Sequence, residues 1–203
     1  MLFPEHAAKG RSKLSGMKTR YEALTLDNWD DLEKLFGERG GCGGCWCMAW
    51  RRKSKAFRAG LGASNKRALR ALVEAGRPTG ILLYKDEEPV GWCSIAPREE
   101  FVRLKGSRVW APVDDKPVWS VSCFFVAKPY RNHGVSVELL KAAAAFAKKN
   151  GARIVEGYPL DLKGKRLPDA FVWTGLLGTY KDAGFAEAAR RSERKPIMRK
   201  IVR

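Results

Sequence analysis

The chain has 203 residues, a formal net charge of +17 and a hydrophobic share of 45%. These values are typical of one folded domain with its own core and do not fit a disordered chain. No uncharged apolar stretch approaches the roughly 18 residues that cross a bilayer, so the sequence predicts no membrane-spanning segment. The positive charge attracts nucleic acid, anionic membranes and phosphorylated small molecules alike, and does not choose among them.

The N-terminal stretch MLFPEHAAKGRSKLSG is polar and lacks the apolar core of a signal peptide. We therefore expect residues 1–17 to form a polar extension, residues 18–203 to form a single domain, and the protein to be cytoplasmic. Five cysteines, an odd number, occur in a chain without an export signal. Reduced thiols are the expected state.

The first half of the chain predicts a strand, a helix, a glycine-rich loop, further helices and a hairpin. Asp27 and Ser64 have the residue types of helix N-caps, and Trp46, Trp50 and Phe57 would share one helical face. In chain order the predicted elements are a strand at 19–26, a helix at 27–37, a helical segment around 46–57, a helix at 64–76 and a hairpin at 79–96.

The second half alternates strands and helices. The predicted elements are a short helix at 98–106, a strongly apolar strand at 118–127, a helix at 134–151, a strand at 152–161, a helix within 168–183, and a final strand pair at 184–191 and 195–202. This order indicates an α/β layer on a mixed sheet. Two strand–helix–strand crossings predict parallel pairing in the middle of the sheet.

The turn PYRNHG joins the most apolar strand to the clearest helix. Backbone N–H groups at a helix start have no partner within the helix, and the helix dipole favours an anion there by ~0.3–2 kcal/mol per charge. Arg131 adds a full positive charge, and Gly134 allows close approach to the backbone. The turn therefore predicts a diphosphate site, although an ordinary strand-to-helix connection explains the turn alone equally well.

The wider stretch FFVAKPYRNHGVSVELL resembles the acetyl-coenzyme A motif of the GCN5-related N-acetyltransferases (GNAT), V-x-P-x-x-R/Q-x-x-G-x-G/A followed by paired leucines. Five positions match: Val126, Arg131, Gly134, Leu139 and Leu140. Two positions depart from the pattern, because Pro129 comes one residue late and Ser136 replaces a glycine or alanine.

A second motif lies downstream, where TYKDAGF is similar to the Y-x-x-x-G-F ending of that family. Tyr180, Gly184 and Phe185 are in register. Trp173 stands where the family often has asparagine, about seven residues before the tyrosine. Together with the order of elements, the two motifs make the resemblance specific.

The resemblance implies an α/β fold with a mixed, mostly antiparallel twisted sheet, a splayed central parallel pair and flanking helices. It also implies acetyl-CoA as co-substrate, no metal, and direct attack by a primary amine on the thioester. The main chains of Phe124 and Val126 would hold pantetheine, and Tyr180 would be the general acid. The implied diphosphate contacts are Arg131, Asn132, His133, Gly134, Val135 and Ser136.

An alkyl amine is mostly protonated at neutral pH, so some group must take its proton. Glu156 lies on the strand after the coenzyme helix and is a candidate base, and Cys123 is a candidate contact of the acetyl group. The alternatives are an outward-facing glutamate and a buried core cysteine. Tyr180 has an alternative as well, in which it packs against Phe185.

The sequence CGGCWC suggests part of a metal site, with Cys42, Cys45 and Cys47 at ligand-like spacing. Four ligands are usual, however, and the chain has only two histidines, His6 and His133. If Cys45 and Cys47 begin a helix, they point about 200° apart, which prevents joint ligation. We therefore expect no metal and assign these residues to the acceptor side of the site, with a thiol or metal sensor as an alternative.

A nucleic-acid- or ribosome-associated binding module is the main alternative to an enzyme. It is supported by the net charge of +17 and by tryptophans beside the basic stretch RRKSKAFR at 51–58. The alternative interpretation of that stretch is an ordinary solvated helix face without a binding role. The acceptor is not predicted, although the basic surroundings and the tryptophans favour a small or acidic one. The final strand pair offers an edge for a homodimer.

Overall fold

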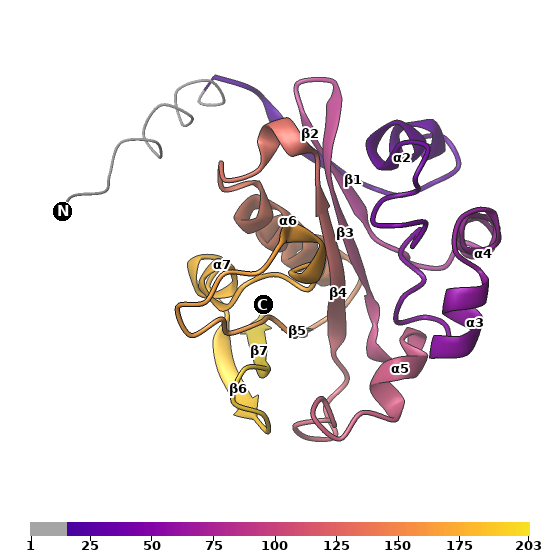
Figure 1. Cartoon of the computed structure of the whole chain (residues 1–203). Helices are drawn as coiled ribbons and strands as arrows, with labels where there is room; N and C mark the ends of the chain where they lie inside the picture. Colours follow the sequence, from indigo (N-terminus) through magenta and orange to yellow (C-terminus); the bar gives the residue numbers. More distant parts are fainter. Residues whose placement is uncertain (1–15) are drawn as a thin grey trace.

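A computed structural model describes residues 16–203, and Figure 1 shows their arrangement. The described strands form one sheet in the order β1-β2-β3-β4-β5-β7-β6. Their bounds are β1 Thr19–Ala23, β2 Ile81–Lys85, β3 Glu88–Pro97, β4 Trp119–Val126, β5 Ile154–Gly157, β6 Ala186–Arg190 and β7 Pro196–Ile201.

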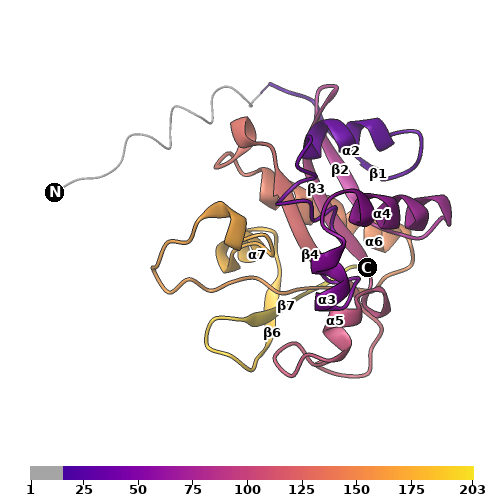
Figure 2. The same ribbon diagram turned by 45° about the vertical axis from the view of Figure 1, so that its right-hand side comes forward.

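Helices cover both faces of this sheet. Their bounds are α2 Trp29–Phe36, α3 Ser54–Ala59, α4 Ala63–Glu74, α5 Val102–Lys105, α6 Val135–Lys149 and α7 Leu177–Asp182. Figures 1 and 2 show α2, α3 and α4 on one side of the sheet and α6 and α7 on the other. None of these helices of residues 16–203 is long and apolar enough to cross a membrane.

The sheet is antiparallel except for one pair, β4 and β5, which run parallel in its middle. The first predicted crossing, β4-α6-β5, therefore does place two parallel strands side by side. The second crossing does not, because β7 inserts between β5 and β6 and pairs antiparallel with both. The predicted fold class is confirmed.

The alternation of side chains along β2 and β3 divides the core between the two faces. Leu82 and Trp92 pack with α2 and α4 in one cluster, whereas Leu83 and Val90 pack with α6 in another. The fully buried indole of Trp92 is one of the largest side chains on the α2 side. The sheet is thus covered by apolar contacts on both faces around its centre.

Several local predictions are wrong. The segment from Trp46 to Arg52 is a series of turns, and the helix begins only at Ser54, because the backbone of Trp46 and Cys47 takes positive φ angles of 34° and 45°. The N-caps are Asn28 and Gly62, not Asp27 and Ser64.

The basic stretch is not a uniformly solvated face either. Arg51 is 7% exposed, pairs with Glu100 at 3.0 Å and donates to the carbonyl of Pro78. The predicted N-terminal extension, residues 1–17, lies outside the described residues apart from Gly16 and Met17.

Strand β5 ends where α7 packs against it. A Cβ at Gly157 would lie 2.1 Å from a ring carbon of Tyr180, so only glycine leaves room for that fully buried ring. Pro159 follows two residues later and cannot donate to a strand ladder. These two features stop β5 well before its parallel neighbour β4 ends.

We predict that Gly157→Ala lowers the free energy of unfolding by about 1–3 kcal/mol, because the added methyl group overpacks the ring of Tyr180. Urea unfolding followed by circular dichroism measures the change. Gly106→Ala is the matched control, since a Cβ there meets nothing within 4 Å. Equal stabilities of the two variants would contradict this account of how β5 ends.

Candidate active site

A wedge opens between β4 and β5 because the two strands pair over only three positions. The pairs are Trp119 with Val155, Ser120 with Glu156, and Val121 with Gly157, after which β4 continues alone to Val126. The N–H of Ala127 donates to Val90 of β3 at 2.9 Å. Because main-chain groups alternate sides along a strand, those of Val126 and Phe124 point away from β3, into the wedge.

Residues 160–176, which we call the strap, lie along this wedge. The N–H of Phe124 donates to the carbonyl of Trp173 at 2.7 Å, and the carboxylate of Asp169 pairs with Arg131 at 2.8 Å. The guanidinium of Arg131 also donates to the carbonyl of Val126 at 3.0 Å. The strap therefore binds main-chain and side-chain groups that the resemblance to the GNAT family assigns to coenzyme binding.

A cavity of about 350 Å³ lies beside the wedge, between β4, the start of α6 and the strap. Five of the predicted coenzyme contacts line it: Phe124, Val126, Arg131, Asn132 and Ser136. The other three, His133, Gly134 and Val135, lie outside its lining, and the side chain of Val135 is buried in the core. The structure thus brings most of the predicted set together.

The start of α6 fits an anionic group. Gly134 caps this helix in the left-handed conformation, with φ at 82°, and no side chain caps the first turn by a hydrogen bond. A Cβ at Gly134 would meet nothing within 4 Å, so the space outside the turn is open. The backbone N–H groups of the first turn of α6, together with the guanidinium of Arg131, suit the diphosphate of a coenzyme.

Tyr180 lies at the closed end of the wedge. Its hydroxyl donates to the carbonyl of Thr174 at 3.3 Å, and its ring packs edge-on against Phe124 and Phe185 with centroid separations of 6.1 and 5.2 Å. Burial raises the pKa of this phenol well above its ordinary value. The hydroxyl is therefore protonated at neutral pH, and the ring also makes the predicted packing contact with Phe185.

Glu156 lies outside both cavities described here, and its side chain is 1% exposed. One carboxylate oxygen accepts from Arg98 at 2.8 Å and from Tyr158 at 2.6 Å, and the other accepts from Arg199 at 2.7 Å. The glutamate that was expected to face outward or to receive a proton is instead a buried, fully paired anion. Its role as a general base stays a prediction, which this geometry does not favour.

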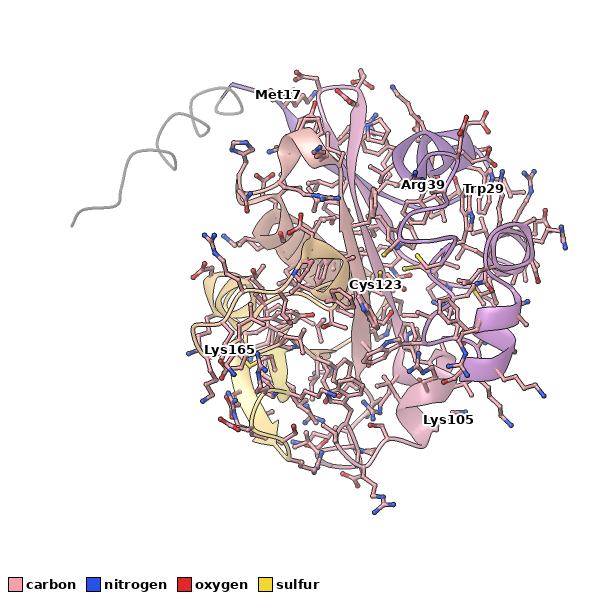
Figure 3. All side chains as sticks on the ribbon, viewed as in Figure 1. Met17, Trp29, Arg39, Lys105, Cys123 and Lys165 are labelled. Atoms are coloured by element: carbon pink, nitrogen blue, oxygen red, sulfur yellow. The ribbon has the colours of Figure 1, made fainter. Side chains whose placement is uncertain are left out.

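A second cavity, of about 210 Å³, continues from the first toward α2 and α3. The two cavities share Cys42, Phe124, Phe125, Ala170 and Trp173. The lining of the second is completed by Phe36, Cys45, Cys47, Ala49, Phe57, Arg103 and Cys123. Figure 3 shows Cys123 near the centre of the molecule, on β4.

The thiols of Cys45, Cys47 and Cys123 line this second cavity. The thiol of Cys45 donates to the carbonyl of Gly40 at 3.8 Å, and that of Cys123 donates to the carbonyl of Phe124 at 3.7 Å. The neighbouring thiol of Cys123 and burial raise the pKa of Cys47. For Cys123, the neighbouring thiol of Cys47 is the largest influence and lowers the pKa, but burial and the other nearby cysteines together raise it, and the net change is upward.

The left-handed turn at Trp46 and Cys47 corrects the expectation that Cys45 and Cys47 point apart. Even so, residues 16–203 contain no group of three or more His, Cys, Asp or Glu side chains arranged to hold a metal ion. The absence of a metal in the working protein stays a prediction.

The sequence pattern of the acetyltransferase (GNAT) family matches residues 43–158, which is more than half of the chain. The chain therefore belongs to this family. It is an acetyltransferase, and its acyl donor is acetyl-CoA.

Solved structures show the same fold. A GNAT-family acetyltransferase from Listeria monocytogenes has a TM-score of 0.55 and 9% identity, covering 93% of this chain and 98% of its own. The PaiA N-acetyltransferase of Thermoplasma acidophilum, in complex with coenzyme A, has a TM-score of 0.51 and 12% identity, covering 92% and 100%. The GNAT domain of S. lividans PAT has a TM-score of 0.51 and 15% identity, covering 93% of each. None of the curated protein sequences matches this chain.

Sequence reasoning missed three site residues: Arg103, Asp169 and Trp173 as a main-chain acceptor. Asp169 and Trp173 lie in the strap, which has no periodicity, and their partners are far away in the sequence. Arg103 was one basic residue among many. The departure from the family's asparagine at position 173 was the only signal in the sequence.

Proposed function

We propose that this protein transfers the acetyl group of acetyl-CoA to a primary amine by direct attack on the thioester. The observation that carries the proposal is the open-ended wedge of β4, which leads from the glycine-capped start of α6 to the hydroxyl of Tyr180. Arg131 and the N–H groups of residues 134–136 would hold the diphosphate. The main chains of Phe124 and Val126 would hold pantetheine.

Coenzyme binding requires the strap to change its contacts. Its carbonyl at Trp173 accepts the hydrogen bond that Phe124 would give to pantetheine, and Asp169 holds the guanidinium that would pair with diphosphate. Both contacts have a direct replacement in the bound state, so the exchange leaves no buried polar group without a partner. We infer that the strap moves away from β4 when acetyl-CoA enters.

Tyr180 would protonate the departing thiolate. A thiol with an ordinary pKa near 8.5 is a fair leaving group, and a phenol near 10 or above remains a donor at neutral pH. Because its pKa is raised, Tyr180 keeps its proton until the thiolate leaves. Movement of the strap would also uncover the hydroxyl, whose partner is the strap carbonyl of Thr174.

The coenzyme site is tested by Ser136→Glu, which places a negative charge in the first turn of α6, inside the cavity. We expect acetyl-CoA affinity measured by calorimetry to fall at least about tenfold, because the carboxylate competes for the same N–H groups. Ala145→Glu adds the same charge to an exposed position of the same helix and should bind normally. Equal affinity for both variants would contradict the site.

The strap contact is tested by Asp169→Asn, which removes the carboxylate that pairs with Arg131. Because the side chains of this pair are 36% and 71% exposed, its loss is worth at most about 1 kcal/mol, and we expect acetyl-CoA to bind up to about fivefold more tightly. The exposed Asp115→Asn removes the same charge elsewhere. Weaker binding by Asp169→Asn would show that the strap assists the coenzyme.

The proposed acid is tested by Tyr180→Phe, which keeps the ring and its packing. We expect kcat to fall by ~10²–10⁴ with acetyl-CoA affinity unchanged, because only the proton donor is lost. Turnover is followed by thiol release, and urea unfolding checks that the variant is folded. A kcat within twofold of the wild type would mean that the phenol only packs.

The remaining expectations stay predictions. They are a cytoplasmic location, a homodimer through the final strand pair, and the alternative of a nucleic-acid- or ribosome-associated module. No contact among residues 16–203 supports the location or the dimer, and none favours the nucleic-acid module over the enzyme.

A further inference from the structure

One cation lines the second cavity. Arg103 is the only charged side chain among the described residues that line it. This exposed guanidinium donates to the carbonyl of Ala49 at 2.9 Å. A guanidinium has five N–H donors in a planar fork, which suits a carboxylate. A ligand of this cavity would therefore carry its negative charge at the Arg103 end.

Aromatic rings and thiols form the walls of the second cavity between Arg103 and the coenzyme wedge. Phe36, Phe57, Phe125 and Trp173 contribute rings, and three of the cysteines contribute thiols that remain protonated. A cavity of about 210 Å³ is smaller than the ~300–1,000 Å³ of pockets that hold drug-sized ligands, which suits a ligand of about one substituted ring. Aromatic pairs gain attraction beyond the area they bury, so these walls favour a flat ligand.

The two cavities offer no free base to an ammonium group. Among the described lining residues of both, Asp169 is the only carboxylate, it is paired with Arg131, and histidine is absent. An alkyl amine with a pKa near 10.4 is neutral about one time in 800 at pH 7.5. An aromatic amine is already neutral, because its ring withdraws the nitrogen lone pair, and needs no base before attack.

We propose that the acceptor is a small aromatic amine that carries a carboxylate, bound in the second cavity with the carboxylate on Arg103 and the nitrogen toward the wedge. The net charge of +17 acts in the same direction, because it repels polyamines and attracts anions. This inference rests on the proposed acetyl transfer and names the substrate of that same site. The shared lining at Cys42, Phe124 and Trp173 provides the connection between ring and thioester.

In the reaction, the amine nitrogen forms a bond to the acetyl carbon while the carbon–sulfur bond breaks. Tyr180 donates its proton to the sulfur, water accepts the proton released by the nitrogen, and solvent reprotonates the phenolate. The products are an N-acetylated aromatic amine and coenzyme A.

The experiment compares three acceptors: 3-aminobenzoate, aniline, which lacks the carboxylate, and 3-(aminomethyl)benzoate, which has an alkyl amine. Thiol release with acetyl-CoA gives kcat/KM for each. We expect 3-aminobenzoate to exceed both others by about tenfold or more, in keeping with a charge-assisted hydrogen bond and with the cost of deprotonating an alkyl amine. A preference for the aminomethyl compound, or for spermidine, would overturn the inference.

The variant Arg103→Gln should lower kcat/KM for 3-aminobenzoate about tenfold and leave that for aniline unchanged. Lys105→Gln, on the same helix but outside the cavity lining, is the charge-matched control. Loss on both acceptors alike, or an equal loss in the Lys105 variant, would remove Arg103 from acceptor recognition.

Binding separates failure of this inference from failure of the proposed function. Calorimetry of 3-aminobenzoate with the protein saturated by coenzyme A should show binding that Arg103→Gln weakens, whether or not turnover is seen. If acetyl-CoA binds in the manner tested by Ser136→Glu but 3-aminobenzoate does not bind, the acceptor class is wrong and the enzyme stands. If 3-aminobenzoate binds at Arg103 but acetyl-CoA does not bind, the pocket stands and the transfer reaction fails.

Discussion

The unequal lengths of β4 and β5 determine the rest of this structure. Gly157 and Pro159 end β5, whereas β4 continues to Val126 with main-chain groups that no neighbouring strand satisfies. A row of unpaired peptide groups in the middle of a sheet is costly unless another partner binds it. The wedge therefore requires an occupant, and an extended amide-containing chain such as pantetheine has the matching donors and acceptors.

In the present structure the strap is that occupant. Its carbonyl at Trp173 takes the N–H of Phe124, and its carboxylate at Asp169 takes Arg131. A peptide carbonyl stands where an amide of pantetheine would bind, and a carboxylate stands where a phosphate would bind. The free enzyme thus keeps the buried donors of β4 satisfied with an internal substitute of the same chemistry. In the proposed binding mode, acetyl-CoA would compete with this substitute, and the affinity for coenzyme would include the free energy of releasing the strap.

The sequence could predict those parts of the site that follow from local patterns. The uncharged run at 118–127 predicts β4, and Arg131 and Gly134 predict an anion site at the start of α6, because strand, turn and helix are contiguous in the chain. The turn at Cys47 could not be predicted in the same way. Tryptophan and cysteine rarely take positive φ, and helical spacing of the aromatic residues gave a misleading signal.

Contacts between distant segments were beyond such reasoning. The pairing of Arg131 with Asp169 and the location of Arg103 depend on how the strap and α5 fold back over the sheet. Glu156 illustrates the same limit. Its strand position was predicted, but its orientation and its two arginine partners come from β7 and from the segment after β3. Nothing near Glu156 in the chain reveals those cations, so the sequence alone also allows this glutamate to be a base.

The position of Glu156 also explains why the wedge can open at one end only. At its closed end, Ser120, Glu156 and Arg199 are neighbours across β4, β5 and β7, and the carboxylate is buried between two guanidinium groups. Breaking a buried pair of this kind costs about 3–5 kcal/mol, since one charge is left without a partner. At the open end, the strap is held by an exposed ion pair worth at most about 1 kcal/mol, by one main-chain hydrogen bond to β4, and by the edge-on packing of Trp173 against Trp50. In the proposed binding mode, strain applied by an entering coenzyme would therefore be relieved by movement of the strap, while the three strands beneath Tyr180 would keep their register and hold the phenol near the departing sulfur.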